Sequence, residues 1–433
     1  MAGRYGLRRE KLGHSFSPEI HAQLADYAYS LIEKRPEELD AFFTEKAFDG
    51  LNVTIPYKKA VLRYLQEPSP RARKIGCVNT VQKRAAGSLY GDNTEYDGFL
   101  YLLRRRGVSA AGKKAIVLGS GGGSLTACTV LREEGAAEVA VISRSGPDNY
   151  ENLSRHYDAQ IVVNTTPVGM YPNNGHAPID LRPFVRCEAV VDIVYNPART
   201  QLLLDAERLG IPAINGLPML VAQAKRACEV FLDEKIGDMR VEEITRKIEK
   251  RMCNVILIGM PGCGKSTVGV LAAKALTMDF VDTDLLLQRK AGRPLQRMVD
   301  ELGAEGFAHV EEACVCGLEA RGAVIATGGS VAMEDAAMEH LKEGGLVIFL
   351  RLPLETLSRR LKNMKTRGIA MEKGQTLRDL YERRQPAYLK WADAVVDAEG
   401  LGVEETVARV VAAVREREGQ TQETEAEKAG KQN

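Results

Sequence analysis

One short segment carries the residue types of a nucleotide-phosphate site at fixed spacing. Gly259-Met-Pro-Gly-Cys-Gly-Lys265-Ser266 fits the pattern GxxxxGK[ST], and an apolar run precedes it. In this pattern the loop amides surround the phosphates, the lysine reaches the outer phosphates and the serine hydroxyl binds Mg²⁺. The sequence therefore predicts a phosphate-binding loop with these nucleotide ligands: Gly262, Gly264, Lys265, Ser266 and Thr267.

Two carboxylates follow the next apolar run, in the segment Asp282-Thr-Asp284. At the end of a strand, both would face the same site as the phosphate loop. Phosphoryl transfer uses one group to hold Mg²⁺ and another to accept the proton of the attacking hydroxyl. We expect the two aspartates to divide these tasks, and the alternative is a solvated acidic turn.

A second glycine loop follows the apolar run Lys114–Leu118, with the spacing Gly119-x-Gly121-x-x-Ser124. A strand, such a loop and a helix form the dinucleotide-binding fingerprint, whose third position needs only a small residue. The predicted cofactor ligands in this loop are Gly119, Ser120, Gly121, Gly122 and Gly123. Arg144 ends the next apolar run, where NAD enzymes usually carry a carboxylate and where an arginine suits the 2′-phosphate of NADP. NADP is the expected cofactor, and the alternative for Arg144 is a solvated loop residue.

Hydride transfer to a ketone also requires a proton for the carbonyl oxygen. A lysine can donate it when burial or a neighbouring carboxylate adjusts its pKa and orientation. Lys58 stands just beyond an expected strand, at the end of Gly50-Leu-Asn-Val-Thr-Ile-Pro-Tyr-Lys58. By residue type alone, a lysine at this place is more often a surface residue.

The apolar pattern indicates the elements that hold these residues. Both glycine loops stand between a β-branched run and a helical pattern, and further apolar runs follow them: Val139–Ser143, Ile161–Asn164, Val190–Val194, Val324–Thr327 and Leu346–Leu350. Strands that alternate with helices indicate two parallel α/β sheets. Before residue 110, extended runs at Gly50–Ile55 and Val78–Lys83 alternate with amphipathic helices.

We therefore expect an α/β chain of three domains. An α/β substrate domain covers residues 1–107, and residues 216–248 pack back on it. A Rossmann NADP domain covers residues 108–215, and a P-loop parallel α/β domain of the nucleoside-monophosphate-kinase type covers residues 252–415. Residues 416–433 contain almost no apolar side chains, so we expect this tail to be disordered.

The composition is that of an ordinary globular protein. The 433 residues are 45% hydrophobic and 27% charged, and the formal net charge of +1 gives no general affinity for nucleic acid or membranes. We expect neither a signal peptide nor a membrane span, and the eight scattered cysteines indicate reduced thiols. A cytoplasmic enzyme acting on small molecules is expected, with no prediction of its oligomeric state.

From residue 1 to about 240 the chain resembles shikimate dehydrogenases, in motifs that keep the order of the family. These are His14-Ser-Phe-Ser-Pro18, Asn52-Val-Thr-Ile-Pro-Tyr-Lys58, Val78-Asn-Thr80, Asn164-Thr-Thr-Pro-Val-Gly-Met170, Asp192-Ile-Val-Tyr-Asn-Pro197 and Gly216-Leu-Pro-Met-Leu-Val-Ala-Gln223. The resemblance implies Lys58 as the acid/base group, and Thr165 and Gly216 beside the cofactor. It also implies these substrate contacts: Ser15, Ser17, Asn52, Thr54, Asn79, Tyr195 and Gln223.

One departure falls on the expected catalytic pair. The family carries Asn-Thr-Asp, whose aspartate partners the lysine, whereas this chain reads Asn93-Thr-Glu95-Tyr-Asp97-Gly98. We assign the role to Glu95, because Gly98 then keeps its family position. Two alternatives stay open. Asp97 is the partner, or activity is weakened because a misplacement of about 1 Å can cost roughly a hundredfold in rate.

From about residue 252 to 400 the chain resembles shikimate kinases. Beyond the phosphate loop and its two aspartates, the matches are Ala326-Thr-Gly-Gly329, Arg367 in an expected lid and Arg384-Gln-Pro-Ala-Tyr388. The resemblance implies ATP as the phosphoryl donor, Asp282 at Mg²⁺ and Asp284 on the substrate hydroxyl. It further implies Gly328 and Gly329 along the substrate, Arg384 on its carboxylate and Arg367 over the γ-phosphate.

This half departs further from its family. Ala308 stands where the family has an arginine that helps to bind the carboxylate, Ser330 replaces a glycine, and Arg367 is followed by Gly-Ile where Pro-Leu is usual. His309 is a possible substitute for the arginine, although we expect it on a solvated helix face. These departures concern the identity of the substrate of the kinase half and leave the ATP-binding motif intact.

Together the two halves predict a bifunctional enzyme of the shikimate pathway. The first half would reduce 3-dehydroshikimate to shikimate with NADPH, and the second would phosphorylate that alcohol with ATP to shikimate 3-phosphate. Two alternatives are a kinase half for another small hydroxy acid and a non-catalytic nucleotide-binding regulator. Intact Lys265, Ser266, Asp282 and Asp284 argue against the regulator.

Overall fold

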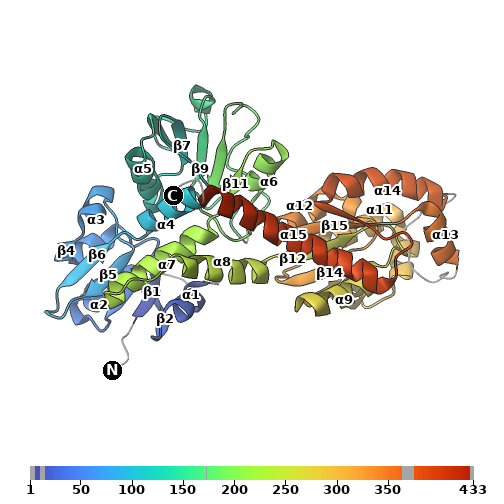
Figure 1. Cartoon of the computed structure of the whole chain (residues 1–433), viewed down its shortest axis with the longest axis horizontal. Helices are drawn as coiled ribbons and strands as arrows, with labels where there is room; N and C mark the ends of the chain where they lie inside the picture. The colour runs from blue at the N-terminus through green and yellow to red at the C-terminus, as the bar shows by residue number, and fades with distance from the viewer. Residues whose placement is uncertain (1–4, 10–14, 172, 363–374, 430–433) are drawn as a thin grey trace. The chain divides into compact units, whose positions relative to one another are not determined.

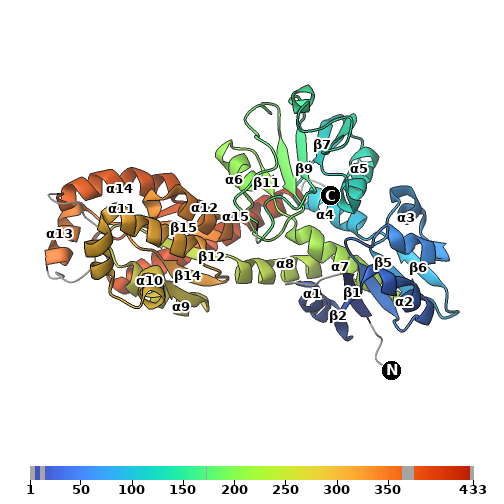
Figure 2. The same cartoon turned by 180° about the vertical axis from the view of Figure 1, so that it is seen from behind.

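The computed structural model describes residues 5–9, 15–171, 173–362 and 375–429. They form two compact units: the first runs to Asn196 and continues over Leu202–Ile248, and the second holds Pro197–Gln201 and the residues from Glu249 onward. Figures 1 and 2 label the elements of each unit from opposite sides. Each unit is described by itself below.

The N-terminal sheet of the first unit is mixed, with the strand order β2-β1-β3-β5-β6-β4. The strands are β1 (Tyr5–Arg9), β2 (Tyr29–Glu33), β3 (Gly50–Val53), β4 (Glu67–Pro68), β5 (Thr80–Lys83) and β6 (Leu89–Asp92). The helices are α1 (Ser17–Leu24), α2 (Leu39–Glu45) and α3 (Pro70–Ile75). The strand expected over Gly50–Ile55 ends at Val53, because the chain turns at Thr54, whose carbonyl accepts a hydrogen bond from the Tyr57 amide at 2.9 Å.

A second sheet of this unit is parallel, with the order β11-β10-β9-β7-β8. Its strands are β7 (Lys114–Leu118), β8 (Glu138–Ile142), β9 (Ile161–Asn164), β10 (Ala189–Asp192) and β11 (Ala213–Ile214), with α5 (Gly122–Glu133) and α6 (Gln201–Arg208) beside them. Side chains of β7 alternate between two cores: Ala115 and Val117 face one, Ile116 and Leu118 the other. The strands are mostly apolar, with polar residues at their ends, as expected of a sheet that is covered on both faces.

Two long helices connect these sheets. α4 (Glu95–Arg105) follows β6, and α7 (Leu217–Leu232) runs beside it, as Figure 1 shows. α7 also packs on α1 and β5, and α8 (Met239–Met252) continues the chain. The helical structure expected after residue 216 is confirmed.

The second unit is built on one parallel sheet with the order β13-β14-β12-β15-β16. The strands are β12 (Asn254–Ile258), β13 (Asp279–Asp282), β14 (Ala323–Ala326), β15 (Gly345–Arg351) and β16 (Ala394–Asp397). The helices are α9 (Lys265–Leu276), α10 (Thr283–Ala291), α11 (Leu295–Cys316), α12 (Asp335–Gly344), α13 (Leu354–Lys362), α14 (Leu377–Trp391) and α15 (Val403–Ala429). Central strands β12 and β15 are almost wholly buried, so the parallel α/β architecture expected of this half is confirmed.

Residues 416–433 are expected to be disordered, whereas the structure continues α15 (Val403–Ala429) over the described part of this segment. The expectation rested on the lack of apolar residues, which predicts little burial but does not oppose a helix. The segment contains no proline and is rich in Glu, Gln, Lys and Ala, which are good helix formers.

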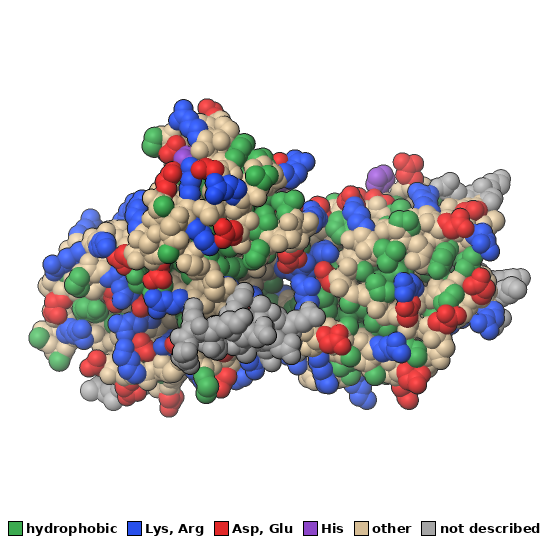
Figure 3. All heavy atoms as spheres, turned by 45° about the horizontal axis from the view of Figure 1, so that its top comes forward, with side chains coloured by type: hydrophobic (Ala, Val, Ile, Leu, Met, Phe, Trp, Pro, Cys, Tyr) green, Lys and Arg blue, Asp and Glu red, His purple; other side chains and the backbone are tan. Residues whose placement is uncertain are grey.

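Surface and cysteine features add three observations. Acidic and basic side chains are mixed over the face drawn in Figure 3, in line with a net charge of +1. Within the part of the chain that the structure describes, no helix has the length and apolar character needed to cross a membrane. None of the eight cysteines, all of them in described segments, forms a disulfide.

Candidate active sites

Lys58 and Glu95 form an ion pair in the interior of the first unit. The Lys58 ammonium donates to Oε1 of Glu95, and each side chain is 11% exposed. The Val78 amide donates to the Lys58 carbonyl at 2.9 Å, which fixes the loop after β3 beside β5. The Thr94 amide donates to Oδ1 of Asn79 at 2.7 Å and fixes the start of α4, whose first residue is Glu95. Backbone hydrogen bonds on two elements therefore hold the ammonium and its carboxylate partner in place.

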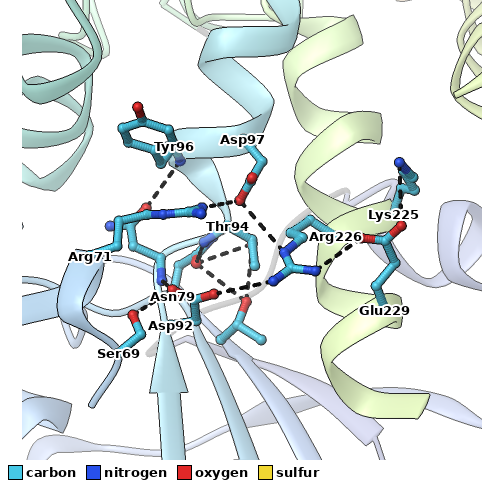
Figure 4. Close-up of polar contacts among 12 residues, drawn as sticks. Ser69, Arg71, Asn79, Asp92, Thr94, Tyr96, Asp97, Lys225, Arg226 and Glu229 are labelled. Carbon is cyan, nitrogen blue, oxygen red and sulfur yellow. Dashed lines mark hydrogen bonds and ion pairs between the residues drawn. The ribbon is translucent and has the colours of Figure 1, made fainter. Parts of the chain in front are cut away.

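Asp97 has different partners from Glu95. Its carboxylate pairs with Arg71 from α3, and Arg226 of α7 lies 3.8 Å away (Figure 4). Burial raises the pKa of Asp97, and the two arginines oppose that shift. The geometry thus brings Glu95 to Lys58 and leaves Asp97 in a separate charge network.

An amide chain connects three residues expected to contact the substrate. Nδ2 of Asn79 donates to Oε1 of Gln223 on α7 at 3.3 Å. Nδ2 of Asn52 donates to Oγ1 of Thr80 at 3.1 Å and to the Asn79 carbonyl at 3.4 Å, while its Oδ1 accepts from the Tyr29 hydroxyl at 2.7 Å. Both amide hydrogens of Asn52 are therefore engaged within the protein, and this side chain orients Asn79.

Tyr29 and His21 support this chain, and neither was predicted. The His21 ring stacks on Tyr29 with a centroid distance of 3.9 Å, and Nδ1 lies 2.5 Å from the Tyr27 hydroxyl. Burial lowers the pKa of His21 to about 3, so the ring is neutral near pH 7. Aromatic residues are common in strands, so a tyrosine in β2 gives no signal of such a role.

The expected substrate loop, which contains Ser15 and Ser17, makes an aromatic contact with the segment that follows β10. Ser15 and Ser17 are half-buried at the start of α1, and the Ser17 amide donates to Oγ of Ser15 at 3.3 Å. Phe16 between them lies 6.0 Å, centroid to centroid, from Tyr195. Thr54 lies directly after β3, in the turn that leads to Lys58.

The glycine loop of residues 119–123, which follows β7, lies directly beside Lys58. A Cβ added to Gly122 would lie 3.2 Å from Cδ of Lys58. Gly119 has φ of +103°, and a Cβ there would lie 2.9 Å from Oγ1 of Thr165, which itself donates to the Leu118 carbonyl at 2.6 Å. The positive φ and the close approach require glycine at position 119, whereas the neighbour of Gly122 is the flexible Lys58 side chain. The loop that would hold a dinucleotide therefore lies beside the catalytic candidate.

The other residues of this glycine loop lie between the end of β7 and the start of α5. Ser120 is exposed, Gly121 immediately precedes the first turn of α5, and a Cβ added to Gly123 would lie 3.0 Å from Ile193. At Gly216 an added Cβ would lie only 2.2 Å from the Ile193 carbonyl oxygen, so no side chain fits. The amides at the start of α5 and its dipole favour an anion here.

Arg144 lies two residues after β8, the strand next to β7 in the parallel sheet. It therefore emerges at the same sheet edge as the glycine loop of residues 119–123. The side chain is exposed, and its charge opposes the rise that burial causes in the pKa of Tyr150. An exposed guanidinium at this edge is placed to meet a phosphate on the cofactor ribose.

In the second unit, the phosphate loop folds around its own lysine. Nζ of Lys265 donates to the carbonyls of Gly259 at 2.7 Å and Met260 at 3.2 Å, and the residue is 8% exposed. Gly262 and Gly264 have φ of +81° and +105°, in the left-handed region that favours glycine. The loop is thus shaped to present amides and one buried ammonium.

Asp282 and Asp284 take different positions at the start of α10. Oδ1 of Asp282 caps the helix by accepting from the amides of Asp284 at 3.0 Å and Leu285 at 3.2 Å. Oδ1 of Asp284 would lie 2.8 Å from a Cβ added to Gly328, so glycine permits the carboxylate to approach the end of β14. The two carboxylates are therefore not equivalent, as two separate tasks would require.

Gly329 and Arg384 form the next wall of this site. A Cβ added to Gly329 would lie 2.9 Å from Nη1 of Arg384, a residue that is 5% exposed. The Gly329 carbonyl accepts from the Tyr388 hydroxyl at 2.7 Å, one turn after Arg384 on α14. This arrangement places a buried guanidinium against the glycine strand end.

A cavity of about 440 Å³ joins the parts of this site. Among its lining residues are Gly262, Gly264, Lys265, Ser266, Thr267, Asp282, Asp284, Gly329, Ser330 and Arg384. The residues expected to bind the phosphates, the metal, the substrate hydroxyl and the substrate carboxylate thus line one cavity. Arg367 lies outside the described residues.

The comparisons with known proteins agree with this geometry. Residues 9–81 match the substrate-binding domain of shikimate dehydrogenases. The NADP⁺-dependent shikimate dehydrogenase of Clostridium perfringens is 34% identical over 268 residues, which cover 57% of this chain and 98% of that protein. The chain belongs to the shikimate dehydrogenase family. The corresponding enzyme of Clostridium beijerinckii is 35% identical, over 54% of this chain and 94% of its own length.

Solved structures extend the comparison to the fold of this shikimate dehydrogenase. A chorismate mutase/shikimate 5-dehydrogenase fusion protein from Clostridium acetobutylicum has a TM-score of 0.55 and 36% identity, over 58% of this chain and 98% of that chain. The Thermus thermophilus shikimate 5-dehydrogenase, solved with NADP(H) and shikimate, has a TM-score of 0.52 and 32% identity, over 57% and 99%.

The second unit matches the shikimate kinase family over residues 261–415. This range includes the phosphate-loop lysine Lys265, both aspartates and Arg384. The chain is thus a fusion of a shikimate dehydrogenase with a shikimate kinase domain.

Glu311 is a kinase-domain residue with no role predicted from the sequence. It is 2% exposed on α11, lines the large cavity, and accepts a hydrogen bond from Oγ of Ser330 at 2.5 Å. Burial raises its pKa to about 7. Ser330, a departure from the shikimate kinases, therefore has a defined contact with a buried acid.

Ala308 lies one turn before Glu311 and opens a second cavity. This space of about 310 Å³ is lined by Ala308, Ser330 and Arg384, among others. The His309 side chain is 69% exposed and lies 3.9 Å from Glu312, in line with the solvated position expected for it. An arginine at position 308 would have room beside Arg384.

Proposed function

We propose that the chain catalyses two successive reactions of the shikimate pathway. The dehydrogenase unit reduces 3-dehydroshikimate to shikimate with NADPH, and the kinase domain phosphorylates shikimate with Mg-ATP to shikimate 3-phosphate. The observation that carries the first reaction is the Lys58–Glu95 pair beside Gly122 of the cofactor loop, where an added Cβ would lie 3.2 Å from Cδ of Lys58. The second reaction rests on the single cavity that joins the phosphate loop, both aspartates and Arg384.

In the dehydrogenase unit, Lys58 is proposed as the proton donor. Bound NADPH supplies the hydride. As the ketone carbon accepts it, the Lys58 ammonium gives a proton to the carbonyl oxygen, which becomes the alcohol. Glu95 holds the ammonium in place and compensates its charge in the buried site.

NADPH fits the residues at the carboxyl end of β7. The glycines at 119 and 122 leave room where a side chain would clash, and α5 points its amino end at the loop. Arg144 is proposed to bind the 2′-phosphate, and Thr165 and Gly216 to border the cofactor. The same residues give the basis for a preference of NADPH over NADH.

The substrate is proposed to lie between the start of α1 and the α7 face that carries Gln223. Ser15 and Ser17 would hold its carboxylate, and Asn79 and Gln223, already hydrogen-bonded to each other, would bind ring hydroxyls. Two further contacts are proposed from Thr54 and Tyr195. Asn52 acts through Asn79, because its own amide is engaged.

In the kinase domain, the phosphate loop and the two aspartates divide the work. Lys265 is proposed to bind the outer phosphates, and Ser266 and Asp282 to serve Mg²⁺, whose charge neutralises the transferred group. Asp284 accepts the proton of the substrate hydroxyl. Arg384 binds the substrate carboxylate, with Gly328 and Gly329 alongside. That Arg367 lies over the γ-phosphate stays a prediction. The cytoplasmic location also stays a prediction.

The test supplies 3-dehydroshikimate, NADPH and Mg-ATP to the full chain and identifies products by mass. We expect shikimate and then shikimate 3-phosphate. Lys58→Ala should stop reduction but still phosphorylate added shikimate, whereas Asp284→Asn should accumulate shikimate. Phosphorylation of another small alcohol much faster than shikimate would refute the second assignment and leave the first intact.

A further inference from the structure

A network of charged side chains lies between α3, β6, α4 and α7 of the dehydrogenase unit (Figure 4). Arg226 of α7 stands at its centre. Its guanidinium lies 3.1 Å from Glu229, 3.8 Å from Asp97 and 4.0 Å from Asp92. Arg71 of α3 pairs with Asp97 from the other side and lies over the Tyr96 ring, 4.5 Å from its centroid. Three carboxylates are thus held by cations from two different helices.

The carboxylates belong to the elements that carry the proposed active site. Asp97 lies in the first turn of α4, two residues after Glu95. Asp92 ends β6, its carbonyl accepts from the Asn79 amide at 3.2 Å, and its Oδ1 accepts from the Asn93 amide at 2.8 Å. Arg226 therefore contacts the first turn of the helix that begins at Glu95 and the strand end that holds Asn79.

Arg226 also shares its helix with a proposed substrate contact. Gln223 lies one turn earlier on α7 and accepts from Nδ2 of Asn79. A single guanidinium thus connects the elements that carry Glu95, Asn79 and Gln223. It lies between Asp92 and Asp97, two carboxylates whose mutual repulsion contributes to the raised pKa of Asp97.

We propose that Arg226 is a positioning residue of the dehydrogenase reaction: it holds the first turn of α4 against β6 and α7, and so keeps Glu95 on Lys58. This inference rests on the proposed function of that site. Without the cation, Asp92 and Asp97 repel each other, and the start of α4 moves away from β6. Because a shift of about 1 Å can cost roughly a hundredfold in rate, and Arg71 still binds Asp97, we expect a loss of about tenfold.

The test compares Arg226→Gln with Lys225→Gln in the full chain. Lys225 is the neighbouring cation on α7; it pairs with Glu229 and Asp238. For Arg226→Gln we expect the turnover rate in the reductase assay to fall about tenfold, with the KM for NADPH and the kinase activity unchanged. Lys225→Gln should keep its turnover rate within about twofold, since it leaves Asp92 and Asp97 compensated.

A double variant separates positioning from general damage to the fold. Adding Asp97→Asn to Arg226→Gln removes the repulsion with Asp92, so most of the lost turnover rate should return. An unchanged turnover rate in Arg226→Gln, an equal loss in Lys225→Gln, or no recovery in the double variant would overturn the inference. An unaltered chain that reduces no 3-dehydroshikimate would instead refute the proposed function on which the inference rests.

Discussion

Replacing the buried acid of the kinase domain should stabilise that domain in a pH-dependent way. Burial raises the pKa of Glu311 to about 7 from the ordinary value of 4.5. Between these values the unfolded chain loses the proton while the folded domain keeps it, so rising pH disfavours folding. Each pH unit is worth about 1.4 kcal/mol. Glu311→Gln should therefore raise the free energy of unfolding by about 1.4 kcal/mol near pH 5.5 and about 3 kcal/mol near pH 8.

In the unaltered chain, Oγ of Ser330 donates to the Glu311 carboxylate at 2.5 Å. The glutamine keeps this contact, because its amide oxygen can still accept that hydrogen bond. Trp391, the only tryptophan of the chain, is buried in the second unit. Its fluorescence during urea unfolding of the full chain therefore reports the kinase domain alone. Glu312→Gln, the same change on the next residue, should alter stability by less than about 0.5 kcal/mol. A gain that is equal at both pH values, or a loss at pH 8, would refute the reasoning.

Four further results are expected at the proposed active sites. Arg144→Ala should raise the KM for NADPH and change NADH use little, because only NADPH carries the 2′-phosphate; equal losses with both cofactors would contradict the assignment. Lys58→Ala should abolish ketone reduction while NADPH still binds, as measured by fluorescence titration. Glu95→Gln should lower kcat far more than Asp97→Asn, because only Glu95 meets Lys58; the reverse order would make Asp97 the partner. Ala308→Arg should lower the KM for shikimate about ten- to a hundredfold, since a charge-assisted contact contributes about 1.5–3 kcal/mol. The KM for ATP should stay the same, and an unchanged shikimate KM would mean that the added guanidinium does not reach the carboxylate.

The parallel sheets and both glycine loops could be predicted because their signals are local. A strand buried on both faces is a run of apolar residues, and β9 begins and ends where the sequence placed it, at Ile161 and Asn164. The mixed N-terminal sheet was harder, since the turn at Thr54 ends β3 earlier than the apolar pattern does. For the tail, the low apolar content predicts little burial and does not exclude the helix α15 that the structure describes there.

The supporting residues could not be predicted, because their roles depend on contacts between distant segments. Ser330 meets Glu311 across nineteen positions of the sequence, and nothing near either residue marks the bond. The partners of Arg226 come from β6, α4 and its own helix, so a pattern search sees only one more arginine on an amphipathic helix. Conversely, Asn52 lies in a recognisable motif, yet its amide is engaged with Thr80 and the Asn79 carbonyl.

The two units differ in how many sheets carry the residues proposed to act in the reaction. In the kinase domain, Lys265 and Asp284 both stand at the carboxyl ends of strands in one sheet, so phosphate and hydroxyl are handled from a single framework. In the dehydrogenase unit, the loop for the hydride donor follows β7 of the parallel sheet, whereas Lys58 follows β3 of the mixed sheet. In the proposed mechanism, hydride and proton therefore come from two different sheets, and Gly122 and Lys58 lie where residues of the two sheets approach each other. A site of this kind depends on how firmly the residues around the contact are held, which is why α4 and α7, and the charges that join them, matter to the chemistry.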